Sequence, residues 1–218
     1  MIPLYGVPSG LGAGVDWRLF EAGPRAVGFD AAGRMYLASG DAYRIDVLEA
    51  DRVVRSVRRQ VPLREITSAD VDEYREASLA VLDTLSMPDE MRPEQRDQFL
   101  RRVESQERLG LPEVFDPISA LLVSPDGSFW VGARADETPA EAEVGLMWTS
   151  RRSVPNRPTI WDLFGADGAY LGEVSLPARF RPDAVEGFRV IGVLADDLDV
   201  EYVVAFEVVL GEAAGESG

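Results

Sequence analysis

The segment at residues 134–158 carries the side chains whose chemistry best suits ligand binding. It contains Arg134, Trp148, Arg151 and Arg152 in an irregular stretch of the chain. Guanidinium groups donate paired hydrogen bonds to carboxylates, and a neighbouring indole adds apolar contact area. Long loops on a rigid scaffold often carry recognition residues. We therefore predict that these four residues bind a carboxylate or an acidic peptide. The alternative is that the loop folds over the rim and pairs its arginines with the protein's own acids.

A second candidate is the acidic run Asp197, Asp199 and Glu201. Alternate residues of a strand share one face, so these three carboxylates would lie together and could bind Ca²⁺. A calcium site needs six or more oxygen ligands, however, and acidic runs commonly form solvated strand edges that discourage aggregation. We expect such an edge, and we predict no metal and no cofactor.

The composition excludes several kinds of chemistry. The 218 residues include no His and no Cys, which excludes Ser-His-Asp and Cys-His nucleophile systems, zinc fingers, iron–sulfur clusters and disulfides. The net charge of −16 has the wrong sign for phosphate backbones, so we expect no nucleic-acid partner. No apolar run reaches the roughly 18 residues of a transmembrane helix. The first residues also lack the basic and apolar regions of a secretory signal.

Short apolar stretches separated by turn residues predict the scaffold that positions these side chains. In the first part of the chain they cover residues 26–29, 35–38, 43–48 and 53–57. The turn at residues 30–33 ends in a glycine, which accepts a positive φ without strain. Four short strands joined by tight turns predict an antiparallel meander.

The same pattern returns twice. Strands are predicted at residues 119–123, 129–132, 159–164 and 170–174, and a partial third set at 187–194 and 200–210. Repetition of a four-stranded unit is the sequence sign of a β-propeller. Within these strands we expect Trp130 and Trp161 to pack in the core, because Trp buries a large area.

Between the first two sets lies a helical insertion. Thr67 and Asp70 form an acidic version of the capping box, which predicts a helix start, and Pro93 is suited to the first turn of a second helix. We expect the helix pair to lie against a sheet edge or rim. Four arginines cluster on and just after the last strand of the first set, namely Arg52, Arg55, Arg58 and Arg59. We expect them to form a solvated strand face, and the alternative is that acidic residues of the insertion dock on it.

Three stretches resemble a known family. Val123–Val131 resembles the strand–turn–strand of bacterial six-bladed propellers of the NHL-like and TolB-like kind. Trp161–Gly168 resembles the turn between the third and fourth strands of their blades, and Asp196–Val203 resembles their last blade. The resemblance implies a mainly β fold, an incomplete β-propeller of four-stranded antiparallel blades with a two-helix insertion.

We expect a single domain. Its parts are an N-terminal segment with the first blade (1–60), the helical insertion (61–115), a second blade (116–176), a partial third blade (177–210) and a disordered tail (211–218). This length suffices for about three blades, whereas the family has six. The chain is therefore part of a longer protein, or closes a ring as a homodimer, or curls into an irregular sandwich. The resemblance allows a periplasmic or cell-envelope location if the chain is a fragment.

Two functions follow from the resemblance. The first is a non-enzymatic binding or scaffolding propeller that recognises a small ligand or a peptide or protein partner at the mouth formed by its loops. The second is a gluconolactonase-like lactonase, in which a divalent ion in the channel polarises the carbonyl. Those enzymes ring the channel with Glu, Asp and Asn ligands, and this chain has a single Asn, Asn156. We therefore favour the binding role.

Overall fold

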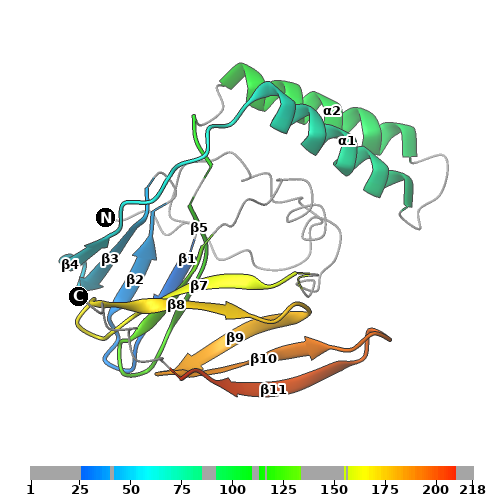
Figure 1. The fold of residues 1–218 in the computed structure, drawn as a ribbon. Helices are drawn as coiled ribbons and strands as arrows, with labels where there is room; N and C mark the ends of the chain where they lie inside the picture. Colours follow the sequence, from blue (N-terminus) through cyan, green and yellow to red (C-terminus); the bar gives the residue numbers. More distant parts are fainter. Residues whose placement is uncertain are drawn as a thin grey trace, which may run out of the picture.

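The protein is mainly β, as predicted, and is built from three antiparallel sheets and a pair of helices (Figure 1). The computed structural model describes residues 26–39, 42–84, 92–109, 113–115, 117–133, 155 and 157–209. The first sheet has the order β1 (Ala26–Phe29), β2 (Met35–Ala38), β3 (Arg44–Glu49), β4 (Arg52–Arg58). The second has the order β5 (Ile118–Val123), β6 (Phe129–Ala133), β7 (Thr159–Phe164), β8 (Tyr170–Leu176). The third has the order β11 (Glu201–Glu207), β10 (Arg189–Ala195), β9 (Phe180–Glu186).

Strand β9 was not predicted from the sequence, whereas β1, β2 and β7 match their predicted ranges residue for residue. The reason lies at Pro182, which is flanked by two charged residues and interrupts the apolar pattern. The register between β9 and β10 shifts at this point, and β9 is an edge strand of its sheet. Proline is tolerated in strands at edges and bulges, so a sequence pattern that reads as a break is here an irregular strand.

The second sheet lies between the other two, so both of its faces are buried. Phe129 and Val131 of β6 point into a core shared with the first sheet. Trp130, between them in the chain, points into a core shared with the third sheet and is 1% exposed. Alternate side chains of a strand point to opposite faces, which explains why β6 is apolar without interruption. Trp161 lies in the same second core, so both tryptophans pack as predicted.

The sheets are stacked with equivalent ends together. β1 lies beside β5, and β5 beside β9. The approach is close, because a Cβ on Gly28 would lie 2.3 Å from the Cγ2 of Val123. The amide of Ala31 donates to the carbonyl of Pro125 at 3.1 Å, which joins the β1–β2 and β5–β6 turns. We call the side of the stack that carries these turns the turn end. The opposite side, where the longer connections begin and finish, is called the loop end.

One turn geometry recurs in all three sheets. In each copy the first residue's amide bonds to the carbonyl four positions later, and the fourth residue's amide bonds back to the first carbonyl. The fourth residue has a positive φ, as expected for a type I turn followed by a left-handed residue. The copies begin at Asp30, Ser124, Gly165 and Asp196. The last copy was not predicted as a turn, because it carries Asp199 where the others carry glycine.

The insertion forms two helices, α1 (Ser68–Thr84) and α2 (Arg92–Leu109). The predicted capping box is present: the Thr67 amide donates to Asp70 Oδ2 at 2.8 Å, and the Asp70 amide donates to Thr67 Oγ1 at 3.4 Å. An isolated antiparallel bridge between Glu65 and Val114 closes the base of the insertion. Figure 1 shows the helices packed on each other beyond the loop end, rather than along the sheet edge or rim where we expected them.

Candidate functional site

The predicted binding residues, Arg134, Trp148, Arg151 and Arg152, lie outside the described residues, as does the predicted tail at 211–218. The described residues do place the two ends of their loop. β6 ends and β7 begins at the loop end, so the connection starts and finishes there. The carbonyl of Pro155 accepts a hydrogen bond from the amide of Arg179 at 2.6 Å, which ties the returning part of the loop to the start of the third sheet.

A buried carboxylate, that of Asp162 in β7, joins the first and second sheets. Its side chain is 0% exposed, and its Oδ2 accepts a hydrogen bond from the hydroxyl of Tyr43 at 2.5 Å. Its Oδ1 accepts bonds from the guanidinium of Arg59 and from the hydroxyl of Tyr170, the latter at 3.2 Å. The Arg59 guanidinium also lies over the Tyr170 ring, 4.6 Å from its centroid.

The electrostatics of this cluster favour one protonation state. Burial, and then the neighbouring Asp162 carboxylate, raise the pKa of both Tyr43 and Tyr170. Burial lowers the pKa of Arg59, but its hydrogen bond and charge interaction with Asp162 outweigh that effect and hold the pKa above its usual value. At neutral pH the two hydroxyls are therefore neutral and Arg59 is charged, and all three groups donate hydrogen bonds to Asp162. The cost of burying Asp162 away from water is compensated only while these donors remain in place. Because Tyr43 and Arg59 come from the first sheet and Asp162 from the second, the cluster links the two sheets.

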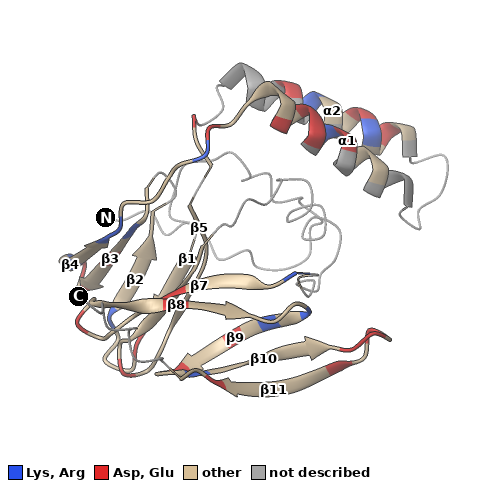
Figure 2. Ribbon diagram, in the orientation of Figure 1, with Lys and Arg blue, Asp and Glu red and all other residues tan. Residues whose placement is uncertain are grey.

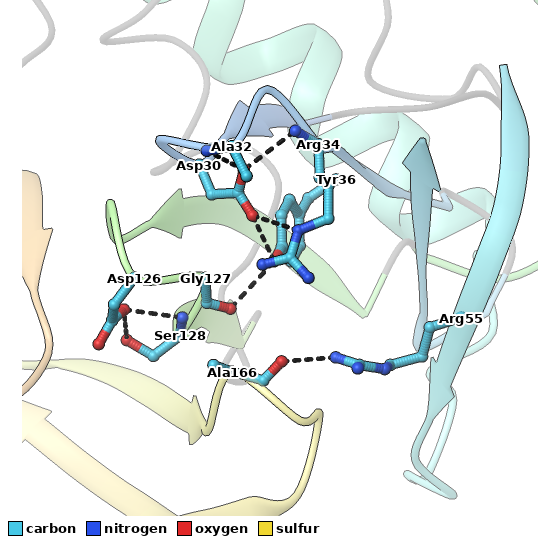
Figure 3. Close-up of polar contacts among 9 residues, drawn as sticks. All are labelled: Asp30, Ala32, Arg34, Tyr36, Arg55, Asp126, Gly127, Ser128 and Ala166. Carbon is cyan, nitrogen blue, oxygen red and sulfur yellow. Dashed lines mark hydrogen bonds and ion pairs between the residues drawn. The ribbon is translucent and has the colours of Figure 1, made fainter. Parts of the chain in front are cut away.

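A second polar cluster lies at the turn end (Figure 3). Asp30 Oδ1 accepts bonds from the amides of Ala32 and Arg34, and its Oδ2 lies 2.6 Å from Arg34 Nε. Burial raises the pKa of Asp30, but these hydrogen bonds and the charge of Arg34 together lower it by more than burial raises it, so the net shift is downward. The hydroxyl of Tyr36 donates to the carbonyl of Gly127 at 3.1 Å, which connects this turn to the second sheet.

Two arginines on and just after β4, Arg55 and Arg59, contact the second sheet. Arg55 donates to the carbonyl of Ala166 at 2.6 Å (Figure 3), and Arg59 binds Asp162. Arg52 and Arg58 are exposed, as a solvated strand face predicts, whereas Arg55 and Arg59 bind the second sheet instead of forming that face or pairing with acids of the insertion. The physical reason is that the β7–β8 turn packs against β4: a Cβ on Gly168 would lie 2.8 Å from the Cγ2 of Val57.

The acidic run near the C-terminus does not form a shared strand face. Asp197 and Asp199 belong to the β10–β11 turn, and only Glu201 lies in a strand. Asp199 pairs with Arg179, whose Nη2 lies 2.5 Å from its Oδ1. Within the part of the chain that the structure describes, no group of three His, Cys, Asp or Glu side chains is placed to hold a metal ion.

The Asp162 cluster was missed by sequence reasoning, although a signal was present. Asp162 lies between Trp161 and Leu163 in a strand of otherwise apolar residues. Aspartate is rarely buried without a partner, so its place in a core strand indicates a buried ion pair. Nothing in the local sequence indicates that the partners are Tyr43 and Arg59, more than 100 residues away.

No family model, no curated protein and no solved structure matches this chain. Among the described residues, no helix has the length and apolar character needed to cross a membrane.

Proposed function

We propose that this chain is a binding or scaffolding protein whose sheets are successive blades of an incomplete β-propeller. Two features support the propeller arrangement. The first strands of the sheets, β1, β5 and β9, are neighbours, as the innermost strands of successive blades are. At the other side of the stack, β4 contacts the β7–β8 turn through Arg55 and Ala166. The first and second sheets therefore face each other with their first strands together on one side and their last strands together on the other.

The observation that carries the binding role is the placement of the long connections. Both the helical insertion and the 134–158 connection begin and finish at the loop end. The turn end carries short turns that bond to one another, such as the bond from the Gly187 amide to Ser124 Oγ at 3.0 Å. A rigid stack of sheets with its long connections gathered at one end is a common design for recognition. We propose that the loop end binds a peptide, a protein or a small acidic ligand.

A hydrolytic function has less support. A propeller lactonase would need carboxylates converging on a metal, whereas the buried carboxylates of Asp30 and Asp162 hold turns and sheets together. Their hydrogen-bond acceptors are engaged by side chains of the same protein. The gluconolactonase-like role is therefore kept as the alternative that the experiment below can reveal.

The experiment titrates the full chain with a fluorescein-labelled hexaglutamate peptide and follows anisotropy. Arg151→Ala with Arg152→Ala removes two guanidinium groups of the predicted site, and Trp148→Ala removes its aromatic ring. The matched control, Arg52→Ala with Arg101→Ala, removes the same charge from exposed positions elsewhere. Binding should be lost in the first two variants and kept in the control. Equal binding by all variants, or none by the wild type, contradicts this site, and lactone hydrolysis abolished by a chelator would favour the enzyme.

A further inference from the structure

The outer face of the first sheet, which is turned away from the second sheet, carries an apolar row that is exposed at its two ends, whereas Leu48 within it is only 9% exposed. Cross-strand pairing places Phe29, Met35, Leu48 and Val53 in one line across its four strands. Phe29 is 62% exposed and Val53 58% exposed. Val27, on the same face of β1, is also exposed. An apolar row of this kind on a sheet face is typical of a surface that packs against another element.

The outer face of the third sheet is apolar as well. Val193 of β10 pairs with Val203 of β11, and Ile191 pairs with Ala205 and Ala184 on either side. Val203 is 80% exposed. The opposite face of the same strands carries Val190 and Phe206, which pack against the second sheet. The stack of sheets therefore begins and ends in an apolar face that no described part of the chain covers.

The first and third sheets differ in charge along the chain, and Figure 2 shows the acidic turn between β10 and β11 in red. Residues 26–58 of the first sheet contain five Arg and five Asp or Glu, so their charges balance, whereas residues 180–207 of the third contain two Arg against seven Asp or Glu. On the first face Arg44 and Arg58 form a cross-strand pair, and Arg44 also pairs with Asp46. On the third face the apolar centre is bordered by Glu186, Glu201 and Glu207 with Arg181 and Arg189. Two opposed third faces would repel each other, whereas a third face meets no excess of like charge on the first face.

We propose that a second copy of this chain covers both faces, with the third sheet of each copy packed on the first sheet of its partner. This inference rests on the propeller arrangement proposed above. Each contact between the two copies would repeat the sheet-on-sheet packing that already joins the first sheet to the second, and the second to the third, within one chain. A stack that spans half a ring has two different ends, and a two-fold axis brings each end against the other end of the partner, so that two copies close a ring of six sheets without leaving a free face.

The test is the mass of the full chain by sedimentation at micromolar concentration. The wild type should have twice the single-chain mass of 23.9 kDa. Val203→Glu places a carboxylate in the centre of the third face, and Phe29→Glu does so on the first, so both should sediment as single chains. The control is Leu198→Glu, which adds the same charge at the tip of the β10–β11 turn, where the side chain is 83% exposed, and should remain a dimer. Unchanged near-ultraviolet circular dichroism from the buried tryptophans will show that each variant is folded.

Mixing the two single-chain variants separates this pairing from any other. A dimer of one Val203→Glu chain and one Phe29→Glu chain carries both substitutions at one of its contacts and none at the other. The mixture should therefore recover dimer that neither variant forms alone. Association through like faces would be broken by only one of the substitutions, and this result would overturn the proposal.

The remaining outcomes are equally decisive. A wild-type mass of a single chain, or masses that grow beyond two chains with concentration, would overturn ring closure. Either result leaves the binding role standing, because hexaglutamate binding at the loop end is measured separately on the same chains. A dimer that behaves as described but does not bind the peptide would contradict the proposed function and leave the pairing intact.

Discussion

Gly127 offers the sharpest test of how the first two sheets are joined. It has a φ of 89°, and a Cβ at this position would lie 2.7 Å from Arg34 Nη2 and 3.0 Å from the hydroxyl of Tyr36 (Figure 3). Gly33 occupies the same position of the β1–β2 turn with a φ of 78°, and a Cβ there would meet nothing within 4 Å. The pair of substitutions Gly127→Ala and Gly33→Ala therefore separates backbone strain from the contact between the sheets.

The expected magnitudes follow from that difference. Both substitutions force an alanine into the left-handed region, at about 1–2 kcal/mol. Gly127→Ala also displaces the buried hydroxyl of Tyr36, which donates to the Gly127 carbonyl, and a disturbed buried hydrogen bond costs about a further 1–2 kcal/mol. We expect Gly33→Ala to lower the free energy of unfolding by about 1–2 kcal/mol and Gly127→Ala by about 2–4 kcal/mol.

The assay is urea unfolding followed by tryptophan fluorescence, which reports on the buried Trp130 and Trp161. The slope of free energy against urea should be unchanged, with only the midpoint shifted. Equal losses for the two variants would mean that the Tyr36 contact contributes nothing. A smaller loss for Gly127→Ala than for Gly33→Ala would refute the reasoning altogether.

Three further predictions concern the polar clusters and the insertion. Asp162→Asn leaves Arg59 and Tyr43 without a charged acceptor and should lower the free energy of unfolding by about 3–5 kcal/mol, as measured by urea unfolding. Asp30 has a pKa below its ordinary value of 3.8, so the unfolded chain takes up its proton first as the pH falls; this contribution to stability is complete above pH 3.8 and is lost as the pH falls through the native pKa. Asp30→Asn should therefore make stability less dependent on pH below 3.8 in acid titrations of the unfolding midpoint, and an unaltered dependence would contradict it. Replacing residues 67–112 by Asn-Gly should leave the sheets folded, because the two segments at the base of the insertion are already joined by the bridge between Glu65 and Val114; loss of the tryptophan circular dichroism signal would show that the helices are needed.

The hairpins show which parts of the fold can be predicted from residues that are close together in the sequence. The β1–β2 and β7–β8 hairpins combine short apolar strands with turns that end in glycine, and both turns were predicted where they occur. These signals involve residues a few positions apart, so they survive without knowledge of the rest of the fold. Strand β9 shows the limit: Pro182 and its charged neighbours are acceptable only because β9 is an edge strand with a register shift.

The candidate site divides in the same way. The position of the 134–158 connection between two strands was evident from the sequence, and its attachment to the loop end follows from antiparallel pairing. The partners of Asp162 and of Tyr36 were not evident. Tyr36 bonds to a carbonyl 91 residues later in the chain, and Tyr43 to a carboxylate 119 residues later.

By itself the amino-acid sequence determined the kinds of element, the places of most turns and the capping of α1, because each depends on side chains and backbone groups that are neighbours along the chain. Only the tertiary structure decided the order of the stacked sheets, the closing of the insertion at its base and the use of Asp162 as a link between sheets. Those depend on which surfaces meet. A buried charged or apolar group is stabilised by partners that are distant in the sequence, and the residues next to it in the chain carry little information about which partners those are.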